Sequence, residues 1–281
     1  MSDKAAAAFV GLGVMGFHSF LQANRVPFET AMAKAWNLKM FRHIQERADA
    51  ASHVLADERG PCPDAADYGF HERFSYKTAI APTASISIIC GGASAGIEPI
   101  SGNSYTHKTL SGSFNVRNRH LVELLTEKGR NDDATWTSIT VNEGSVQHLD
   151  CLTDDEKDVF KTAFELDQRW VIELAGDRAD YIDQSQSVNV FLPADIHKRD
   201  LHQIHLMAWK HGLKSLYYCR SKSIQRAEDV SVAGVANARD GAEKFTPMPL
   251  PGADGEPLPI AALASDDEGD STDYEECLAC Q

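Results

Sequence analysis

Residues 185–218 hold the pattern that decides the fold. They read as an apolar segment, Ser185-Gln-Ser-Val-Asn-Val-Phe-Leu192, a helical segment from Ile196 to His211, and an apolar and aromatic segment, Lys214-Ser-Leu-Tyr-Tyr218. The two outer segments are short and bounded by loops, which is typical of strands buried beneath helices. The middle segment carries apolar residues at helical spacing, and Gly212 is placed to end the helix. Strand, helix and strand in succession indicate an α/β fold.

Two further helices are expected outside this stretch. Segment 28–56 follows Pro27, carries apolar residues at helical spacing and is stopped by Gly60-Pro61. Thr153-Asp-Asp-Glu156 has the form of a capping box, and we expect the helix that it opens to run to Leu174, before Gly176.

The chain is acidic, but much of the excess lies at its end. With 281 residues, 43% of them hydrophobic, it is long enough to build a core. Residues 227–281 carry thirteen of the 41 acidic residues and only Arg239 and Lys244 as bases, and they show no apolar periodicity. We therefore expect a folded domain over 1–226 and a disordered acidic tail over 227–281. The acidity therefore describes a tail rather than a face of the domain, and we expect no nucleic-acid partner.

Neither a membrane span nor a disulfide framework is indicated. No run of about 18 apolar residues occurs, and Met1-Ser-Asp-Lys4 lacks the basic start and apolar core of a signal peptide. Six cysteines in 281 residues are too few for a disulfide scaffold. We expect a cytoplasmic protein with free thiols and no membrane contact.

Gly11-Leu-Gly13-Val-Met-Gly16 fits the glycine pattern of a dinucleotide-binding loop and is similar to the opening of NAD(P)-dependent hydroxyacid dehydrogenases. The context argues against this interpretation. Pro27 shortens the following helix, another helix comes next, and no second strand ends in an acid about 20 residues further on. The alternative is close packing of a glycine-rich helix start against a neighbouring segment, where a side chain would clash.

A hydroxyl-rich stretch, Pro82-Thr-Ala-Ser-Ile-Ser87, leads toward Gly96-Ile-Glu-Pro99. Backbone N–H groups beside Thr and Ser hydroxyls at a helix start form an anion cradle, which suits a phosphate without a lysine. On composition alone, a buried turn explains the stretch equally well.

Tyr217 and Tyr218 close the second strand of the opening pattern. Successive side chains of a strand point to opposite faces, so one ring in the core and one on the surface is the simple expectation. The functional alternative is a pair of adjacent phenols that pass an electron and a proton in sequence.

Cys277-Leu-Ala-Cys280 lies at the chain terminus, behind a cluster of acidic residues. A zinc site needs two further ligands at suitable spacing, and no second cysteine pair exists, so we expect no metal here. The remaining interpretation is an exposed dithiol that exchanges with another disulfide.

Together and in this order, these motifs resemble the large catalytic subunit of class I ribonucleotide reductase, from about Val10 to the terminus. The segment Gly11–Phe20 resembles part of that family's ten-stranded α/β barrel, and Asp183–Asn189 resembles a strand entrance of the same barrel. The resemblance implies the C-terminal part of this barrel, followed by the disordered acidic tail. It also assigns the substrate-phosphate loop to Pro82, Thr83, Ala84, Ser85 and Ile86.

The resemblance further implies roles for the tyrosines and the terminal cysteines. Tyr217 and Tyr218 fall where class I enzymes keep the pair that relays a radical from the small subunit. Cys277 and Cys280 match tail cysteines that re-reduce the active-site disulfide and are themselves reduced by thioredoxin or glutaredoxin. The implied substrate is a ribonucleoside diphosphate. No cofactor is expected on this chain, and the metal cofactor is expected in the small subunit.

Two departures from the family pattern matter. The family's radical-bearing cysteine lies in an Asn-x-Cys-x-Glu loop, which does not occur in this sequence, and Ala84 stands where some relatives carry Glu. We therefore expect the C-terminal portion of a large subunit, inactive alone, whose partners include the missing N-terminal portion and the small subunit. The alternatives are an NAD(P)-dependent dehydrogenase and a non-catalytic remnant that binds the small subunit.

Overall fold

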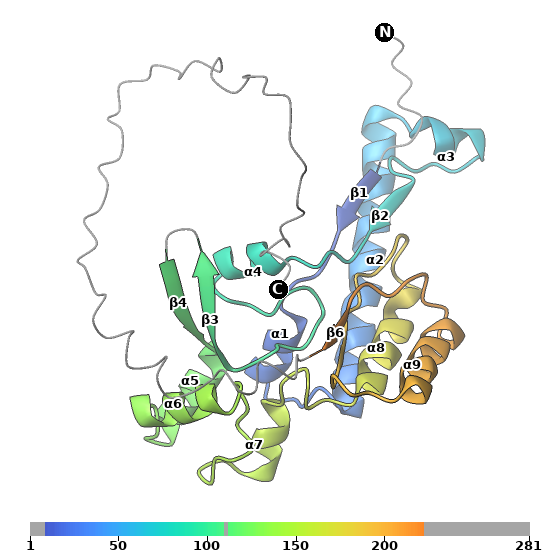
Figure 1. The fold of residues 1–281 in the computed structure, drawn as a ribbon. Helices are drawn as coiled ribbons and strands as arrows, with labels where there is room; N and C mark the ends of the chain where they lie inside the picture. Colours follow the sequence, from blue (N-terminus) through green and yellow to red (C-terminus); the bar gives the residue numbers. More distant parts are fainter. Residues whose placement is uncertain (1–8, 110–111, 222–281) are drawn as a thin grey trace, which may run out of the picture. The chain divides into compact units, whose positions relative to one another are not determined.

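The computed structural model describes residues 9–109 and 112–221 (Figure 1). The predicted division after residue 226, the predicted acidic tail and the Cys277–Cys280 pair lie outside this range. Helices and strands alternate along much of the described chain, which is a mixed α/β organisation. The elements are β1 (Phe9–Leu12), α1 (Phe17–Ala23), α2 (Ala31–Arg59), α3 (Pro63–Asp67), β2 (Tyr76–Thr78), α4 (Ala84–Ile89), β3 (Ser104–Thr109), β4 (Gly112–Arg117), α5 (Arg119–Glu127), α6 (Asp133–Val141), α7 (Asp154–Val159), α8 (Gln168–Ala179), β5 (Val190–Leu192), α9 (Lys198–Lys210) and β6 (Cys219–Ser221).

Parallel pairing joins successive strands in chain order. β1 pairs with β2, an isolated parallel bridge joins Ile80 to Gln186, and β5 pairs with β6. Helices α1, α2 and α3 connect the first pair, and α9 connects the last. Parallel neighbours joined through helices, in sequence order, are the arrangement of part of an α/β barrel. The β3–β4 hairpin is antiparallel and separate from these strands.

The predicted helix ends are confirmed at three places. Gly60 ends α2 as predicted. The helix begins at Ala31 rather than at the predicted residue 28, because the side chain of Thr30 caps it by accepting a hydrogen bond from the N–H of Ala33. The capping box of α7 forms between Thr153 and Glu156 in both directions. Gly212 follows α9 with φ 71°, as expected for a residue that ends a helix.

The single helix predicted over 153–174 is wrong. The chain forms α7, leaves the helix after Val159 and starts α8 behind the N-cap Asp167. The segment between them is buried, and the N–H of Ala163 donates to the carbonyl oxygen of Ile100 (2.7 Å). The buried apolar side chains between α7 and α8 therefore have a spacing in the sequence like that of a helix, although this segment is not helical. Gly176 does not end α8 but lies inside it, where a Cβ would be 2.7 Å from the Cβ of His211.

The last predicted strand is shifted along the chain. We expected it over Lys214–Tyr218, whereas β6 begins at Cys219. Both tyrosines nevertheless join the ladder that leads into β6, because the N–H of Tyr217 donates to Val188 and the carbonyl of Tyr218 accepts from Val190. Long-range pairing with β5, rather than local composition, sets where the strand begins.

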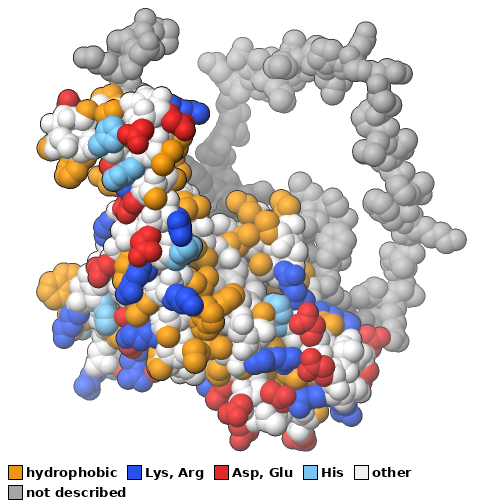
Figure 2. Space-filling model, turned by 180° about the vertical axis from the view of Figure 1, so that it is seen from behind, with side chains coloured by type: hydrophobic (Ala, Val, Ile, Leu, Met, Phe, Trp, Pro, Cys, Tyr) orange, Lys and Arg blue, Asp and Glu red, His pale blue; other side chains and the backbone are white. Residues whose placement is uncertain are grey.

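Two hydrophobic cores support the fold. The first lies among α1, α2, α8, α9 and the parallel strands, and the second lies beneath α5, α6 and α7. In Figure 1, α8 lies between α2 and α9, which matches the contacts among these helices. Figure 2 shows that hydrophobic side chains also reach the surface between charged ones; large exposed ones include Phe9, Ile89 and Trp209. No helix within the described ranges is both long and apolar enough to cross a membrane.

His18 of α1 is buried in the first core region without a charged partner. Its Nδ1 accepts a hydrogen bond from the N–H of Ile100 (3.0 Å), and its ring meets that of Phe28 edge-on. Burial lowers the pKa of His18 to about 3, so the ring is neutral in the folded chain.

We expect the folded chain to lose stability as the pH falls from about 6.5 toward about 3, because His18 takes up a proton only when the chain unfolds. This residue should lower the free energy of unfolding by about 1.4 kcal/mol per pH unit in that window. The variant His18→Asn keeps an acceptor for Ile100 but does not titrate. Urea unfolding of both proteins at several pH values should therefore give the variant the shallower pH dependence. Equal slopes would contradict this assignment.

Candidate functional site

The predicted phosphate loop leaves β2 and turns into the short helix α4. Thr83 adopts a left-handed backbone conformation (φ 48°), and the first helical hydrogen bond runs from the N–H of Ser87 to the carbonyl of Thr83 (3.0 Å). Within the described part of the chain, the N–H groups of Ala84, Ser85 and Ile86 have no acceptor, and these residues are exposed. The loop thus presents three backbone donors to solvent, which is what an anion requires.

Gly96 supports this loop from beneath. Its N–H donates to the Oγ1 of Thr83 (2.8 Å), and a Cβ at this position would lie 2.9 Å from the carbonyl oxygen of Ala81. Its φ of 48° is also in the left-handed region. A residue without a side chain is therefore required where the loop and residue 96 meet.

The glycine-rich segment packs against the stretch that follows the loop. The N–H of Gly16 donates to the carbonyl of Ser94 (2.8 Å), and Ser19 and Ser94 each donate a backbone N–H to the other's hydroxyl. A Cβ at Gly13 would lie 2.6 Å from the carbonyl oxygen of Ala79. The close-packing interpretation of these glycines is therefore confirmed, and the predicted second helix, α2, follows directly after α1.

A buried acid connects this region to the segment that carries the tyrosines. Glu98 is 8% exposed; its Oε2 accepts from the side-chain Nδ2 of Asn189 (3.0 Å) and its Oε1 from the N–H of Asn189 (3.3 Å). The Oδ1 of Asn189 accepts from the N–H of Tyr218 (2.9 Å). Burial raises the pKa of Glu98, although the bonds from Asn189 and the charge of Arg220 oppose that rise.

Tyr217 and Tyr218 form a pair of neighbouring rings. Their centroids are 4.1 Å apart with the planes tilted by 52°, and the residues are 47% and 43% exposed. The expectation of one core ring and one surface ring is therefore wrong, because neither tyrosine is buried and the two rings lie against each other. The guanidinium of Arg220 lies over the ring of Tyr218, 5.8 Å from its centroid.

Hydrogen bonds thus bring together motifs that are far apart in the sequence. Thr83 is bonded to Gly96, and Glu98 is bonded through Asn189 to Tyr218. Cys277 and Cys280 lie outside the described residues, so their predicted role stays a prediction.

The hydrogen bonding between Glu98 and Asn189 was not anticipated from the sequence. Both occur in quoted motifs, but their sequence separation of 91 residues hides the contact. The only hint in the sequence was that Glu98 stands between two apolar residues, Ile97 and Pro99, and the structure shows that both of these are buried. An acid in such surroundings needs a donor partner.

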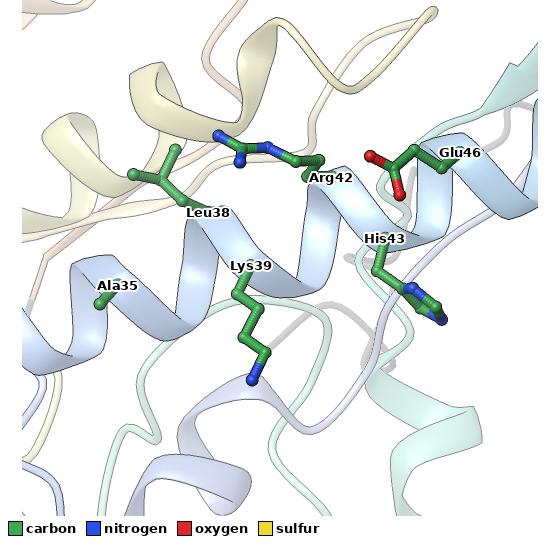
Figure 3. Close-up of a pocket in the computed structure, with 6 residues that line it drawn as sticks. All are labelled: Ala35, Leu38, Lys39, Arg42, His43 and Glu46. Atoms are coloured by element: carbon green, nitrogen blue, oxygen red, sulfur yellow. The ribbon is translucent and has the colours of Figure 1, made fainter.

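A separate hollow of about 400 Å³ lies along α2 (Figure 3). Its lining residues all come from that helix, with Leu38 and Arg42 pointing to the opposite side from Lys39 and His43. None of the predicted site residues lines it. Arg42 contacts the ring and hydroxyl of Tyr181, which gives this side chain a structural role.

The exposed amide loop and the tyrosine pair thus lie in a segment of mixed α/β organisation. The chain belongs to the ribonucleotide reductase large-subunit family: the model described as "Ribonucleotide reductase, barrel domain" matches residues 3–72 and 64–219. This confirms the predicted family and barrel fold, and the dehydrogenase interpretation of the glycines receives no support.

Relatives from viruses and animals agree with this assignment. The chain is 46% identical over 233 residues to a ribonucleoside-diphosphate reductase large subunit of Invertebrate iridescent virus 6, covering 82% of this chain and 24% of that protein. It is 34% identical over 244 residues to the large subunit of Danio rerio, covering 76% and 30% of the two chains. Among solved structures, the Actinobacillus ureae class Id ribonucleotide reductase alpha subunit has a TM-score of 0.70 and 43% identity, covering 76% and 39%. The chain therefore spans about a quarter to two fifths of the length of these relatives.

Proposed function

We propose that this chain supplies the substrate-phosphate loop and the last steps of radical transfer in a ribonucleoside-diphosphate reductase, which makes deoxyribonucleotides from ribonucleotides. The observation that carries the proposal is the connection between the loop with its exposed amides and a closely spaced tyrosine pair: hydrogen bonds join Thr83 to Gly96 and Glu98 through Asn189 to Tyr218, and the backbone of residues 96–98 links the two parts. Relatives named ribonucleoside-diphosphate reductase support the choice of a diphosphate substrate.

The loop binds the substrate through its backbone. The N–H groups of Ala84, Ser85 and Ile86 point their hydrogens at the phosphate oxygens, because no acceptor in the described chain competes for them. Pro82 has no N–H to donate, and Thr83 uses its hydroxyl oxygen to hold Gly96. With Ala84 in place of an acidic residue, recognition at this position depends on the backbone alone.

The tyrosines transfer the radical by successive oxidation of neighbouring phenols. In each step one phenol loses an electron and a proton while the oxidised group before it gains them. A centroid separation of 4.1 Å between Tyr217 and Tyr218 places the two rings in direct contact, which favours such a step. A solved relative of class Id supports class I chemistry, in which a small subunit with its own metal cofactor starts the transfer.

The reduction itself needs groups that this sequence does not contain. A thiyl radical takes the 3′ hydrogen of the ribose and returns it at the end of the cycle. In between, the 2′ hydroxyl leaves as water, and a cysteine pair becomes a disulfide by supplying two electrons and two protons, one proton for the water and one for the new hydrogen on C2′. Asn-x-Cys-x-Glu is absent from this sequence, so we assign the thiyl cysteine to the remaining part of the large subunit.

We propose that Cys277 and Cys280 then reduce that disulfide. Their dithiol becomes a disulfide as the target returns to two thiols, and thioredoxin or glutaredoxin restores the dithiol. Such exchange requires a reducing compartment, which favours the cytoplasm.

A chimeric large subunit tests this function. In the chimera, our chain replaces the matching segment of the Invertebrate iridescent virus 6 large subunit, to which it is 46% identical. With the viral small subunit and a dithiol reductant, we expect conversion of CDP to dCDP within about tenfold of the parent rate, a barrier difference below about 1.4 kcal/mol. A folded chimera that binds the small subunit but makes no dCDP would overturn the proposal and favour a non-catalytic remnant.

A further inference from the structure

Glu98 is a buried carboxylic acid that the proposed chemistry does not use. It is 8% exposed and lies between Gly96, which is bonded to the loop, and Asn189, which directly precedes β5. Burying a carboxyl group is unfavourable unless its oxygens are bonded, and here both oxygens accept hydrogen bonds from one residue. A buried acid that is bonded toward both the loop and the tyrosine segment is well placed to fix their relative positions.

Asn189 transmits the position of Glu98 to the tyrosine pair. The residue is 1% exposed, its Nδ2 donates to Glu98, and its Oδ1 accepts from the N–H of Tyr218. These bonds fix the orientation of the Asn189 side-chain amide. If the amide were rotated by 180°, its nitrogen would face the N–H of Tyr218 and its oxygen would face a carboxyl oxygen of Glu98. The backbone of Tyr218 is therefore fixed relative to Glu98 through one rigid group.

The other end of this connection reaches the phosphate loop. The N–H of Glu98 donates to the carbonyl of Ala95 (3.1 Å), and the neighbouring Gly96 holds the hydroxyl of Thr83. Arg220, whose charge opposes the rise in the pKa of Glu98, lies over the ring of Tyr218. The acid thus has a hydrogen-bonded or electrostatic connection to each functional part.

We propose that Glu98 is a positioning residue, which acts through Asn189 to hold Tyr218 in register with the phosphate loop. The inference rests on the proposed function. Glu98 itself gains and loses no electron: it fixes the backbone at the point where the radical passes from the tyrosine pair toward bound substrate.

A reciprocal exchange of the two side chains tests this role. Glu98→Gln puts an amide N–H₂ against the N–H₂ of Asn189, and Asn189→Asp puts a second carboxylate against Glu98. The double variant restores complementarity, since the nitrogen of the introduced glutamine donates to an oxygen of the introduced aspartate while the bonds to both backbone N–H groups remain. We expect each single variant of the chimera to lose roughly 10- to 100-fold in kcat for CDP. The KM for CDP should stay within about threefold, and the double variant should recover most of kcat.

Glu29→Gln is the matched control. Glu29 is a partly buried acid whose oxygens accept hydrogen bonds from the N–H of Asp167 and the Nζ of Lys161, and within the described residues none of its hydrogen bonds reaches the loop or the tyrosines. We expect this variant to keep the kcat of the parent chimera, whatever its effect on stability.

Amide hydrogen exchange on the 281-residue chain provides a second, turnover-independent measurement. The N–H of Tyr218 should exchange faster in each single variant and be protected again in the double variant. Unchanged kcat and unchanged exchange in Glu98→Gln would overturn the positioning role while leaving the proposed function intact. A parent chimera that makes no dCDP would instead overturn the proposed function and, with it, this inference.

Discussion

Replacing either Tyr217 or Tyr218 with phenylalanine is expected to abolish dCDP formation by the chimeric large subunit. The loss should be roughly 10³-fold or more, which corresponds to about 4 kcal/mol in activation free energy. Phenylalanine keeps the ring but lacks the O–H, so it cannot give up an electron and a proton together. Because both rings are about half exposed, the substitution leaves no cavity in the core and folding should be unaffected.

Tyr76→Phe is the matched control for this prediction. Tyr76 is 45% exposed, close to the values of the pair, and it stacks on Phe9 rather than on another tyrosine. We expect its turnover to equal that of the parent chimera. Near-normal turnover after Tyr217→Phe or Tyr218→Phe would contradict radical transfer through the pair and would show that the rings serve only in packing.

The second large effect is expected from Gly96→Ala, which should weaken binding of CDP to the 281-residue chain by at least about tenfold, or 1.4 kcal/mol. The new Cβ would lie 2.9 Å from the backbone oxygen of Ala81, and that oxygen cannot move without displacing the loop. The displacement also removes the hydrogen bond to Thr83, worth about 1 kcal/mol. Isothermal titration calorimetry with CDP measures the change.

Gly92→Ala separates the clash from the backbone conformation. Gly92 also has a positive φ, 72°, but a Cβ there meets nothing within 4 Å. Both variants therefore carry the left-handed penalty of about 1–2 kcal/mol, and only Gly96→Ala also clashes with the loop. Equal affinities for the two variants would show that residue 96 does not shape the phosphate loop.

Local signals in the sequence were sufficient for some helix ends. The capping box of α7 and the glycines after α2 and α9 act within a few residues, so they can be recognised without knowledge of the fold. The break between α7 and α8 could not be recognised in this way. It depends on a bond from Ala163 to Ile100, which are far apart in the sequence.

The same distinction applies to the site. The proposed phosphate loop and the tyrosine pair are continuous motifs, and their resemblance to a known family indicated their positions in the sequence. The start of β6 depends on pairing with β5, and the role of Glu98 depends on Asn189 on the other side of the site. Side-chain contacts between distant segments carry no periodicity, so the buried pair became visible only in the folded chain.

A residue-resolved titration of the ¹⁵N-labelled chain with CDP tests the central claim most directly, since it asks whether this chain's own loop receives a diphosphate. The account predicts that CDP and pyrophosphate shift the amide signals of Ala84, Ser85 and Ile86, whereas cytidine does not. NAD should leave the signals of Gly11–Gly16 unchanged, because those glycines serve packing. Unchanged signals at residues 84–86 with saturating CDP would contradict the account, as would NAD-dependent shifts at the glycines.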